Sequence, residues 1–89
     1  MKKCAQISIQ GRVQNVGFRY NAQVVANEYN IMGYVKNMRD GSVFVEAEGE
    51  ESDLEKLINW CKKGPEWSRV ENVDVNYVPL NNYSAFNIR

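Results

Sequence analysis

The sequence of 89 residues contains no histidine and only two cysteines. Histidine is the commonest general base and the commonest metal ligand in proteins, so any chemistry must use other groups. Cys4 and Cys61 lie far apart in the sequence, form no CxxC pair and do not make a zinc site. We interpret them as free thiols, at least one of them buried, although their spacing also leaves a disulfide open.

Long apolar stretches and an excess of one charge are missing as well. No segment approaches the ~20 apolar residues of a membrane span, and residues 1–5 lack the apolar core of a signal peptide. Eleven basic residues balance eleven acidic ones, whereas nucleic-acid binding calls for a basic face. We therefore expect a cytoplasmic protein, a monomer by default, that binds neither membranes nor nucleic acid.

What is present is an ordinary globular composition, with 44% hydrophobic and 25% charged residues. A chain of this length is too short to supply two hydrophobic cores, so we expect residues 1–89 to form a single domain. The sequence shows no internal repeat, low-complexity run or linker. With no net charge, any anion-binding site must be local and built by a few groups.

Hydrophobic periodicity predicts four strands, a short terminal strand and two helices. The predicted strands are residues 5–9, 31–36, 42–48 and 70–78, with a short strand at 86–88. The fourth is expected to be bulged, because Val70, Val73 and Val75 are unevenly spaced. The acidic side chains of Glu46, Glu48, Glu50 and Glu51 are expected to form a solvated face.

The first predicted helix begins near Phe18 and ends near Asn30, and the second begins at Ser52 and ends at Gly64. Ser52 and Glu55 have the spacing of a capping box. The order β-α-β-β-α-β is the split βαβ or ferredoxin-like arrangement of the α+β class, in which an antiparallel sheet carries two helices on one face. This fold serves many functions, so it does not determine the chemistry.

The segment from Gly11 to Arg19 joins the first strand to the first helix. At a helix start the first amide groups have no partner within the helix, and the helix dipole adds partial positive charge. Such a junction favours phosphate or sulfate, and the planar guanidinium of Arg19 can donate to two phosphate oxygens. Taken alone, a glycine-spaced loop is more often a plain connection with a solvated arginine.

Asn37 ends the second predicted strand, just before the turn at Asp40 and Gly41. Asparagine commonly starts turns, which is the simpler interpretation. In the split βαβ topology, however, this strand end can lie close to the first loop. A carboxamide there can accept one hydrogen bond and donate another, which suits the orientation of a water molecule.

Two motifs together resemble the acylphosphatase family. The first is Gly11-x-Val13-Gln14-x-Val16-x-Phe18-Arg19, and the second is Gly33-Tyr34-Val35-Lys36-Asn37-x-x-Asp40-Gly41-x-Val43. Further similarity to the bacterial members lies in Glu46-Ala47-Glu48-Gly49, in Gly64-Pro65 and in the ending Phe86-x-Ile88-Arg89. The resemblance therefore covers essentially the whole chain, at the usual length of the family.

The resemblance implies a small stand-alone enzyme that hydrolyses the carboxyl-phosphate bond of small acyl phosphates, giving a carboxylate and inorganic phosphate. It implies that Arg19 and Asn37 are catalytic, with Arg19 clamping the phosphoryl group and Asn37 positioning the attacking water. The implied phosphate-binding residues are Gln14, Asn15, Val16, Gly17, Phe18 and Arg19. No metal or organic cofactor is implied, and inorganic phosphate is expected to act as a competitive inhibitor.

The chain departs from the family at Asn15, where members usually have glycine. Glycine suits a loop that needs positive φ and a close approach of backbone to phosphate. Asparagine is the best substitute in left-handed geometry. The departure motivates one alternative, a catalytically weak or inactive phosphate-binding or regulatory module of the same fold.

Overall fold

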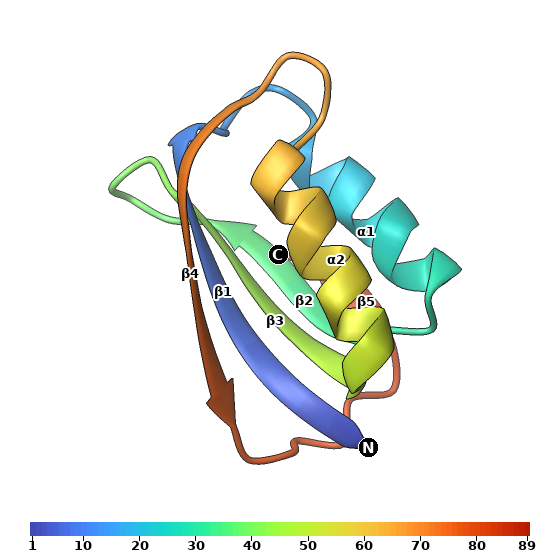
Figure 1. Cartoon of the computed structure of the whole chain (residues 1–89). Coiled ribbons are helices and arrows are strands. Elements are labelled where there is room, and N and C mark those ends of the chain that lie inside the picture. The colour runs from blue at the N-terminus through green and yellow to red at the C-terminus, as the bar shows by residue number, and fades with distance from the viewer.

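The computed structural model describes all of residues 1–89, in which the elements follow the order β1-α1-β2-β3-α2-β4-β5 (Figure 1). The strands are β1 (Lys2–Arg12), β2 (Met32–Asn37), β3 (Val43–Glu50), β4 (Arg69–Val78) and β5 (Phe86–Ile88). The helices are α1 (Phe18–Glu28) and α2 (Glu51–Lys63). Neither helix is long and apolar enough to cross a membrane.

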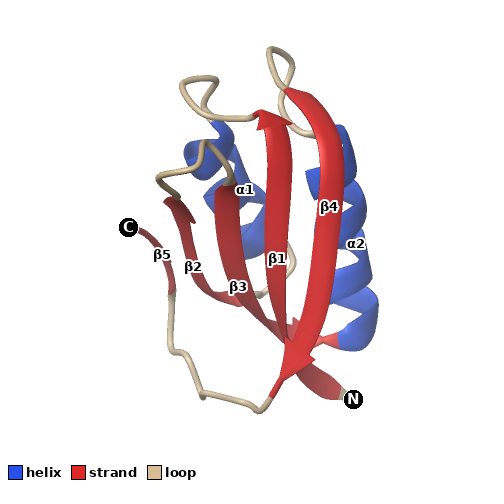
Figure 2. Ribbon diagram, turned by 90° about the vertical axis from the view of Figure 1, so that its left-hand side faces the viewer, coloured by secondary structure: helices blue, strands red, loops and turns tan.

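The five strands form one sheet in the order β4-β1-β3-β2-β5, and both helices cover the same face of it (Figure 2). The first four strands pair antiparallel, as the ferredoxin-like prediction requires. The terminal strand differs, because β5 pairs parallel with β2 and makes the sheet mixed. The connection after Val78 leads from one edge of the sheet to the other, so β5 returns in the direction of β2.

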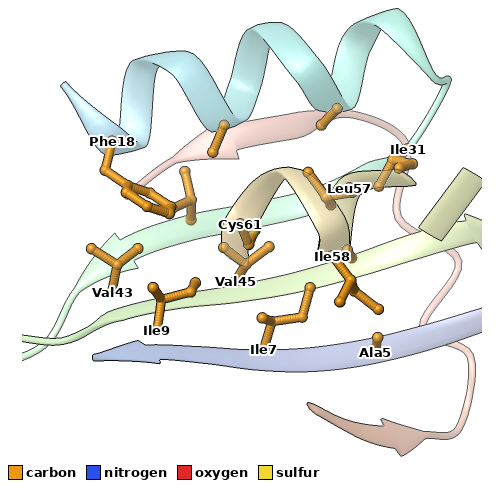
Figure 3. Close-up of a cluster of buried hydrophobic side chains, with 14 of the residues drawn as sticks. Ala5, Ile7, Ile9, Phe18, Ile31, Val43, Val45, Leu57, Ile58 and Cys61 are labelled. Carbon is orange, nitrogen blue, oxygen red and sulfur yellow. The ribbon is translucent and has the colours of Figure 1, made fainter. Parts of the chain in front are cut away.

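The core lies between the sheet and the helices, as the alternation of apolar residues predicts. Figure 3 shows Ile7 and Ile9 of β1 and Val45 of β3 facing Leu57 and Cys61 of α2. Seventeen buried side chains belong to this cluster. Both cysteines are buried and free, which confirms the predicted free thiols.

The predicted irregularities of the chain are partly confirmed. β4 is bulged as expected: Gln10 pairs with Asn72 and Gly11 pairs with Val70, so Glu71 is the extra residue. Asn30, which follows the C-cap residue Tyr29 of α1, has φ 56°, which is the left-handed geometry common just beyond a helix end.

The predicted capping box of α2 is wrong. The helix begins at Glu51, one residue before Ser52, and its N-cap residue Glu50 has extended backbone and no side-chain cap. The carboxylate of Glu50 instead accepts a hydrogen bond from the N-terminal amino group at 3.0 Å. Because β3 runs directly into α2, no loop residue is left to serve as a cap.

The prediction of a solvated acidic face is also wrong for Glu46 and Glu48, which are 6% and 0% exposed. These two side chains point to the face of β3 opposite the helices, because their neighbours Val45 and Ala47 face the core. There the connection between β4 and β5 covers them. The main chain at Asn81 and Tyr83 donates hydrogen bonds to Glu48.

Candidate active site

The carboxyl ends of β1, β2 and β5 lie at the same end of the sheet. β1 and β2 are both antiparallel to β3, and β5 is parallel to β2, so the three strands share a direction. The register aligns them closely: Val43 of β3 pairs with Ile9 on one side and with Asn37 on the other. The loop that follows β1 and the turn that follows β2 therefore leave the sheet side by side.

The loop between β1 and α1 has the backbone geometry that the sequence predicts. Asn15 has φ 63° and Gly17 has φ 77° with ψ 19°, both in the left-handed region. Asn15 thus occupies the conformation that the usual glycine would favour. Left-handed residues within a turn can point successive main-chain N–H groups the same way, a geometry that favours anions.

The main-chain N–H groups of residues 14 to 20 donate no hydrogen bond to another protein atom. The first helical bond of α1 is donated by Asn21 to the carbonyl of Gly17 at 3.1 Å. The N-cap residue Gly17 offers no side chain, and the first turn holds no acidic residue. The positive end of α1 and the preceding loop are therefore open to an anion.

Two apolar side chains fix this loop to the core. Phe18 is 2% exposed, and its ring lies 5.1 Å from the ring of Trp60, measured between centroids. Figure 3 shows Phe18 pointing from the first turn of α1 into the buried cluster. Val16 packs against the same core. The helix start is thus held by packing, so its free N–H groups are arranged before any ligand binds.

Gln14 has a different role from the one its place in the motif suggests. Its side-chain amide donates to the main-chain carbonyls of Met38 and Ser42, at 2.7 and 2.9 Å. The side chain therefore ties the loop to the turn after Asn37, and only the main-chain N–H of Gln14 stays available to an anion. The carboxylate of Asp40 accepts from the main chain and hydroxyl of Ser42, which braces the turn and lowers the pKa of Asp40.

Arg19 is the second residue of α1 and is half-buried. Its guanidinium donates to the main-chain carbonyl of Arg89, just after β5, at 3.2 Å. No Asp or Glu side chain forms an ion pair with it. The remaining N–H groups of this cation are therefore free for an anionic ligand next to the open helix start.

Asn37 lies at the end of β2 and is half-buried. It follows the buried Val35 by two residues, so it lies on the helix-facing side of the sheet, the side from which the first loop rises. Its carboxamide makes no hydrogen bond within the protein. An open pocket of about 460 Å³ is lined by residues 36–40 and includes Asn37, and the phosphate-binding candidates of the loop are not part of its wall.

The cysteines take no part in this arrangement. Burial raises the pKa of the Cys61 thiol to about 12, and burial together with the charges of Glu46 and Glu48 raises that of Cys4 to about 11. Neither sulfur is then a thiolate near neutral pH, so neither is a nucleophile. What the site offers is an anion cradle, one arginine and one free carboxamide.

The structure also assigns contacts that sequence reasoning missed. Arg89 lies beside Arg19 although seventy residues separate them, and its guanidinium stacks 3.8 Å from the centre of the Tyr34 ring. Only the direction and register of β5 create this contact, and a strand of three residues carries too little pattern to reveal either.

Comparison with known proteins agrees with this geometry. The family model "Acylphosphatase" matches residues 5–88. A curated relative from Thermotoga maritima, named acylphosphatase, is 44% identical over 87 residues, which is 98% of this chain and 97% of that protein.

Two solved structures are similar over their full lengths. The acylphosphatase from Bacillus subtilis superposes with a TM-score of 0.95 at 37% identity and covers 100% of this chain and 99% of its own. The structure of an acylphosphatase from Coxiella burnetii gives a TM-score of 0.96 at 33% identity, covering 99% of this chain and 93% of its own.

Proposed function

The chain belongs to the acylphosphatase family and is a hydrolase of acyl phosphates, and we propose that its reaction takes place where the first loop meets the end of β2. In this proposal residues 14–19 hold the phosphoryl group with Arg19 as the clamp. Asn37 positions the water that attacks phosphorus. The comparisons give no support to a non-catalytic phosphate-binding module.

The observation that carries this assignment is the open start of α1. Seven consecutive N–H groups, those of residues 14 to 20, have no partner in the protein, and Arg19 adds a cation that pairs with no Asp or Glu side chain. A phosphoryl group carries charge on three oxygens, which fixed amides and a guanidinium can bind without rearrangement. The turn that contains Asn37 is tied to the same loop by Gln14.

The proposed reaction needs no histidine. The water oxygen forms a bond to phosphorus while the bond from phosphorus to the acyl oxygen breaks, and the carboxylate leaves with that electron pair. A carboxylate is a weakly basic leaving group, so no general acid is required. A phosphoryl oxygen takes the proton of the water. Catalysis then consists of positioning and charge stabilisation, with no metal or organic cofactor in the proposal.

The proposed contacts of residues 14–19 are with the phosphoryl group and not with the acyl part. We therefore propose that several small acyl phosphates are substrates. Inorganic phosphate is the product and is expected to compete for the same groups. We also propose that residues 1–89 act as one domain and as a monomer that binds no nucleic acid. A cytoplasmic location is consistent with two free cysteines, which reducing compartments preserve.

The test is an assay of benzoyl phosphate hydrolysis, in which the loss of the substrate's absorbance reports turnover. Arg19→Ala should lose both phosphate binding and turnover, whereas Asn37→Ala should keep phosphate binding and lose about 10²–10³ in kcat. Arg69→Ala, which removes an exposed arginine at the start of β4, is the matched control. Robust turnover by the double variant Arg19→Ala/Asn37→Ala would contradict the assignment.

A further inference from the structure

Two buried carboxylates bind the connection between β4 and β5. Glu48 accepts hydrogen bonds from the main-chain N–H groups of Asn81, Asn82 and Tyr83, at 2.6, 3.2 and 2.9 Å. Glu46 accepts from the side chain of Asn81 at 3.0 Å and from the hydroxyl of Tyr83. We call these two carboxylates and residues 81–83 the carboxylate latch.

In the carboxylate latch, main-chain N–H groups of the chain bind the buried carboxylate of its own Glu48. Glu48 is 0% exposed, so its charge is stabilised by these N–H groups rather than by water. Burial raises its pKa, but the N–H groups of Asn81, Tyr83 and Asn82, together with Lys2, outweigh that effect and leave the pKa below its ordinary value. Such charge-assisted bonds are about twice as strong as neutral ones.

The segment that follows the latch is short and depends on a few contacts. β5 has three residues, and only Phe86 among them is buried. The register of β5 against β2 is fixed by main-chain hydrogen bonds. Gly33 donates to the carbonyl of Ala85 and Arg89 donates to the carbonyl of Val35, both at 2.8 Å. Gln23 of α1 adds a bond to the carbonyl of Phe86 at 2.9 Å.

The end of this segment reaches the candidate active site. The carbonyl that accepts from Arg19 belongs to Arg89, the residue directly after β5. That bond is the only hydrogen bond Arg19 makes through its side chain, and the side chain pairs with no Asp or Glu. The direction of the guanidinium therefore depends on where β5 places one carbonyl oxygen.

We propose that Glu48, supported by Glu46, is a positioning residue for Arg19. The carboxylate latch holds residues 81–83, these fix the start of β5, and β5 presents the carbonyl of Arg89 that orients the guanidinium. Loss of the latch lets β5 and Arg19 move while the core between helices and sheet remains. This inference rests on the proposed function only in so far as Arg19 binds the phosphoryl group.

The decisive variant is Glu48→Gln, which keeps the shape but turns an amide group toward main-chain donors. Glu50→Gln is its matched control, because Glu50 ends the same strand, is exposed and does not touch the tail. Ile58→Val is the stability control: it loses about 0.5–1.5 kcal/mol of folding free energy from the core without touching the tail.

Three measurements test whether loss of the carboxylate latch changes β5, Arg19 and phosphate binding. Hydrogen exchange of the β5 amides should accelerate at least tenfold in Glu48→Gln. The ¹⁵N heteronuclear NOE of the Arg19 side chain should fall, showing a more mobile guanidinium. The dissociation constant for inorganic phosphate should rise about threefold to tenfold, the range of one net hydrogen bond. Neither control should change the last two measurements.

The outcomes distinguish a positioning role of the carboxylate latch from a purely structural one. If β5 loosens in Glu48→Gln while the mobility of Arg19 and the phosphate affinity stay as in the wild type, the latch is structural only and the proposal is overturned. An equal change in Ile58→Val overturns it as well. Failure of the wild type to bind phosphate would contradict the proposed function instead, and the mobility of Arg19 would still test the latch. If Glu48→Gln does not fold, Tyr83→Phe removes one latch bond and must loosen Arg19 to a smaller degree.

Discussion

The side-chain amide of Gln14 lies 2.7 Å from the main-chain oxygen of Met38 and so joins the loop after β1 to the turn after β2. The same amide also donates to the carbonyl of Ser42 at 2.9 Å. Arg19 lies in the first turn of α1, just after the loop, and Asn37 is the last residue of β2, just before the turn. One side chain therefore sets the spacing between the proposed phosphate clamp and the proposed water-positioning residue.

Replacing Gln14 should uncouple these two parts of the site. Gln14→Glu keeps the length of the side chain but cannot donate to the two carbonyls. We expect kcat for benzoyl phosphate to fall about tenfold to 10²-fold, because small misplacements of reacting groups are costly. Stability should fall by about 1–2 kcal/mol in urea unfolding. Gln10→Glu, a change at a half-buried position of β1 outside the site, serves as the control, and a kcat equal to wild type in Gln14→Glu would contradict this role.

Much of the fold follows from local patterns. Alternation in β1 and β3 and the apolar stripes of the helices predict which side chains reach the core, and the paired Ile7, Val45 and Val75 obey it. The left-handed geometry at Asn15 also follows from the residue type. Patterns of this kind work because burial on one face constrains every second or every third to fourth residue.

The features that the sequence did not predict depend on segments without hydrophobic periodicity. Burial of Glu46 and Glu48 requires residues 81–83 to cross the sheet, and nothing in those residues forces that path. For the same reason the parallel pairing of β5 with β2 could not be predicted. In the candidate site, the helix start that carries Arg19 and the strand end that carries Asn37 were predictable from topology, but the contact of Arg19 with Arg89 was not.

Asn15 should act through its backbone rather than its side chain. Its φ of 63° is tolerated by asparagine and is free of strain for glycine. We expect Asn15→Ala to lose about 1 kcal/mol of folding free energy, and Asn15→Gly to retain wild-type phosphate affinity and turnover or exceed them. Urea unfolding and phosphate titration measure the two effects. A marked loss of phosphate affinity in Asn15→Gly would show that the carboxamide itself binds the anion.

The buried carboxylate of Glu48 should make stability depend on acid. Its pKa is lowered in the folded protein, while an unfolded glutamate titrates near ~4.3. The stabilisation is therefore complete above the unfolded pKa and is lost as the pH falls through the folded pKa. Groups around it are Lys2, Glu46, Cys4 and Tyr83.

The stability difference between wild type and Glu48→Gln should thus be constant from pH 6 to 8 and shrink below about pH 4. Urea unfolding at a series of pH values measures it, with Glu50→Gln as the exposed control. A difference that stays constant down to pH 3 would mean that the charge of Glu48 does not contribute to folding.

Two glycines provide a matched test of how closely β2 must approach β3. Gly33 has φ 138°, and a Cβ placed there would lie 1.8 Å from the main-chain oxygen of Glu46. Gly41 has φ 93° in the turn after Asn37, and a Cβ there would meet nothing within 4 Å. Both replacements strain the backbone, but only Gly33→Ala also forces the strands apart.

Gly33→Ala should therefore cost more than about 4 kcal/mol, in the range reserved for severe disruption, whereas Gly41→Ala should cost only about 1–2 kcal/mol from its backbone geometry. Separation of β2 from β3 would also displace Asn37, which pairs with Val43, so any folded fraction of Gly33→Ala should have reduced kcat. Unfolding curves and benzoyl phosphate turnover of the two variants test this together. Equal losses of stability in both would mean that backbone strain, and not the close contact of the strands, makes glycine necessary at position 33.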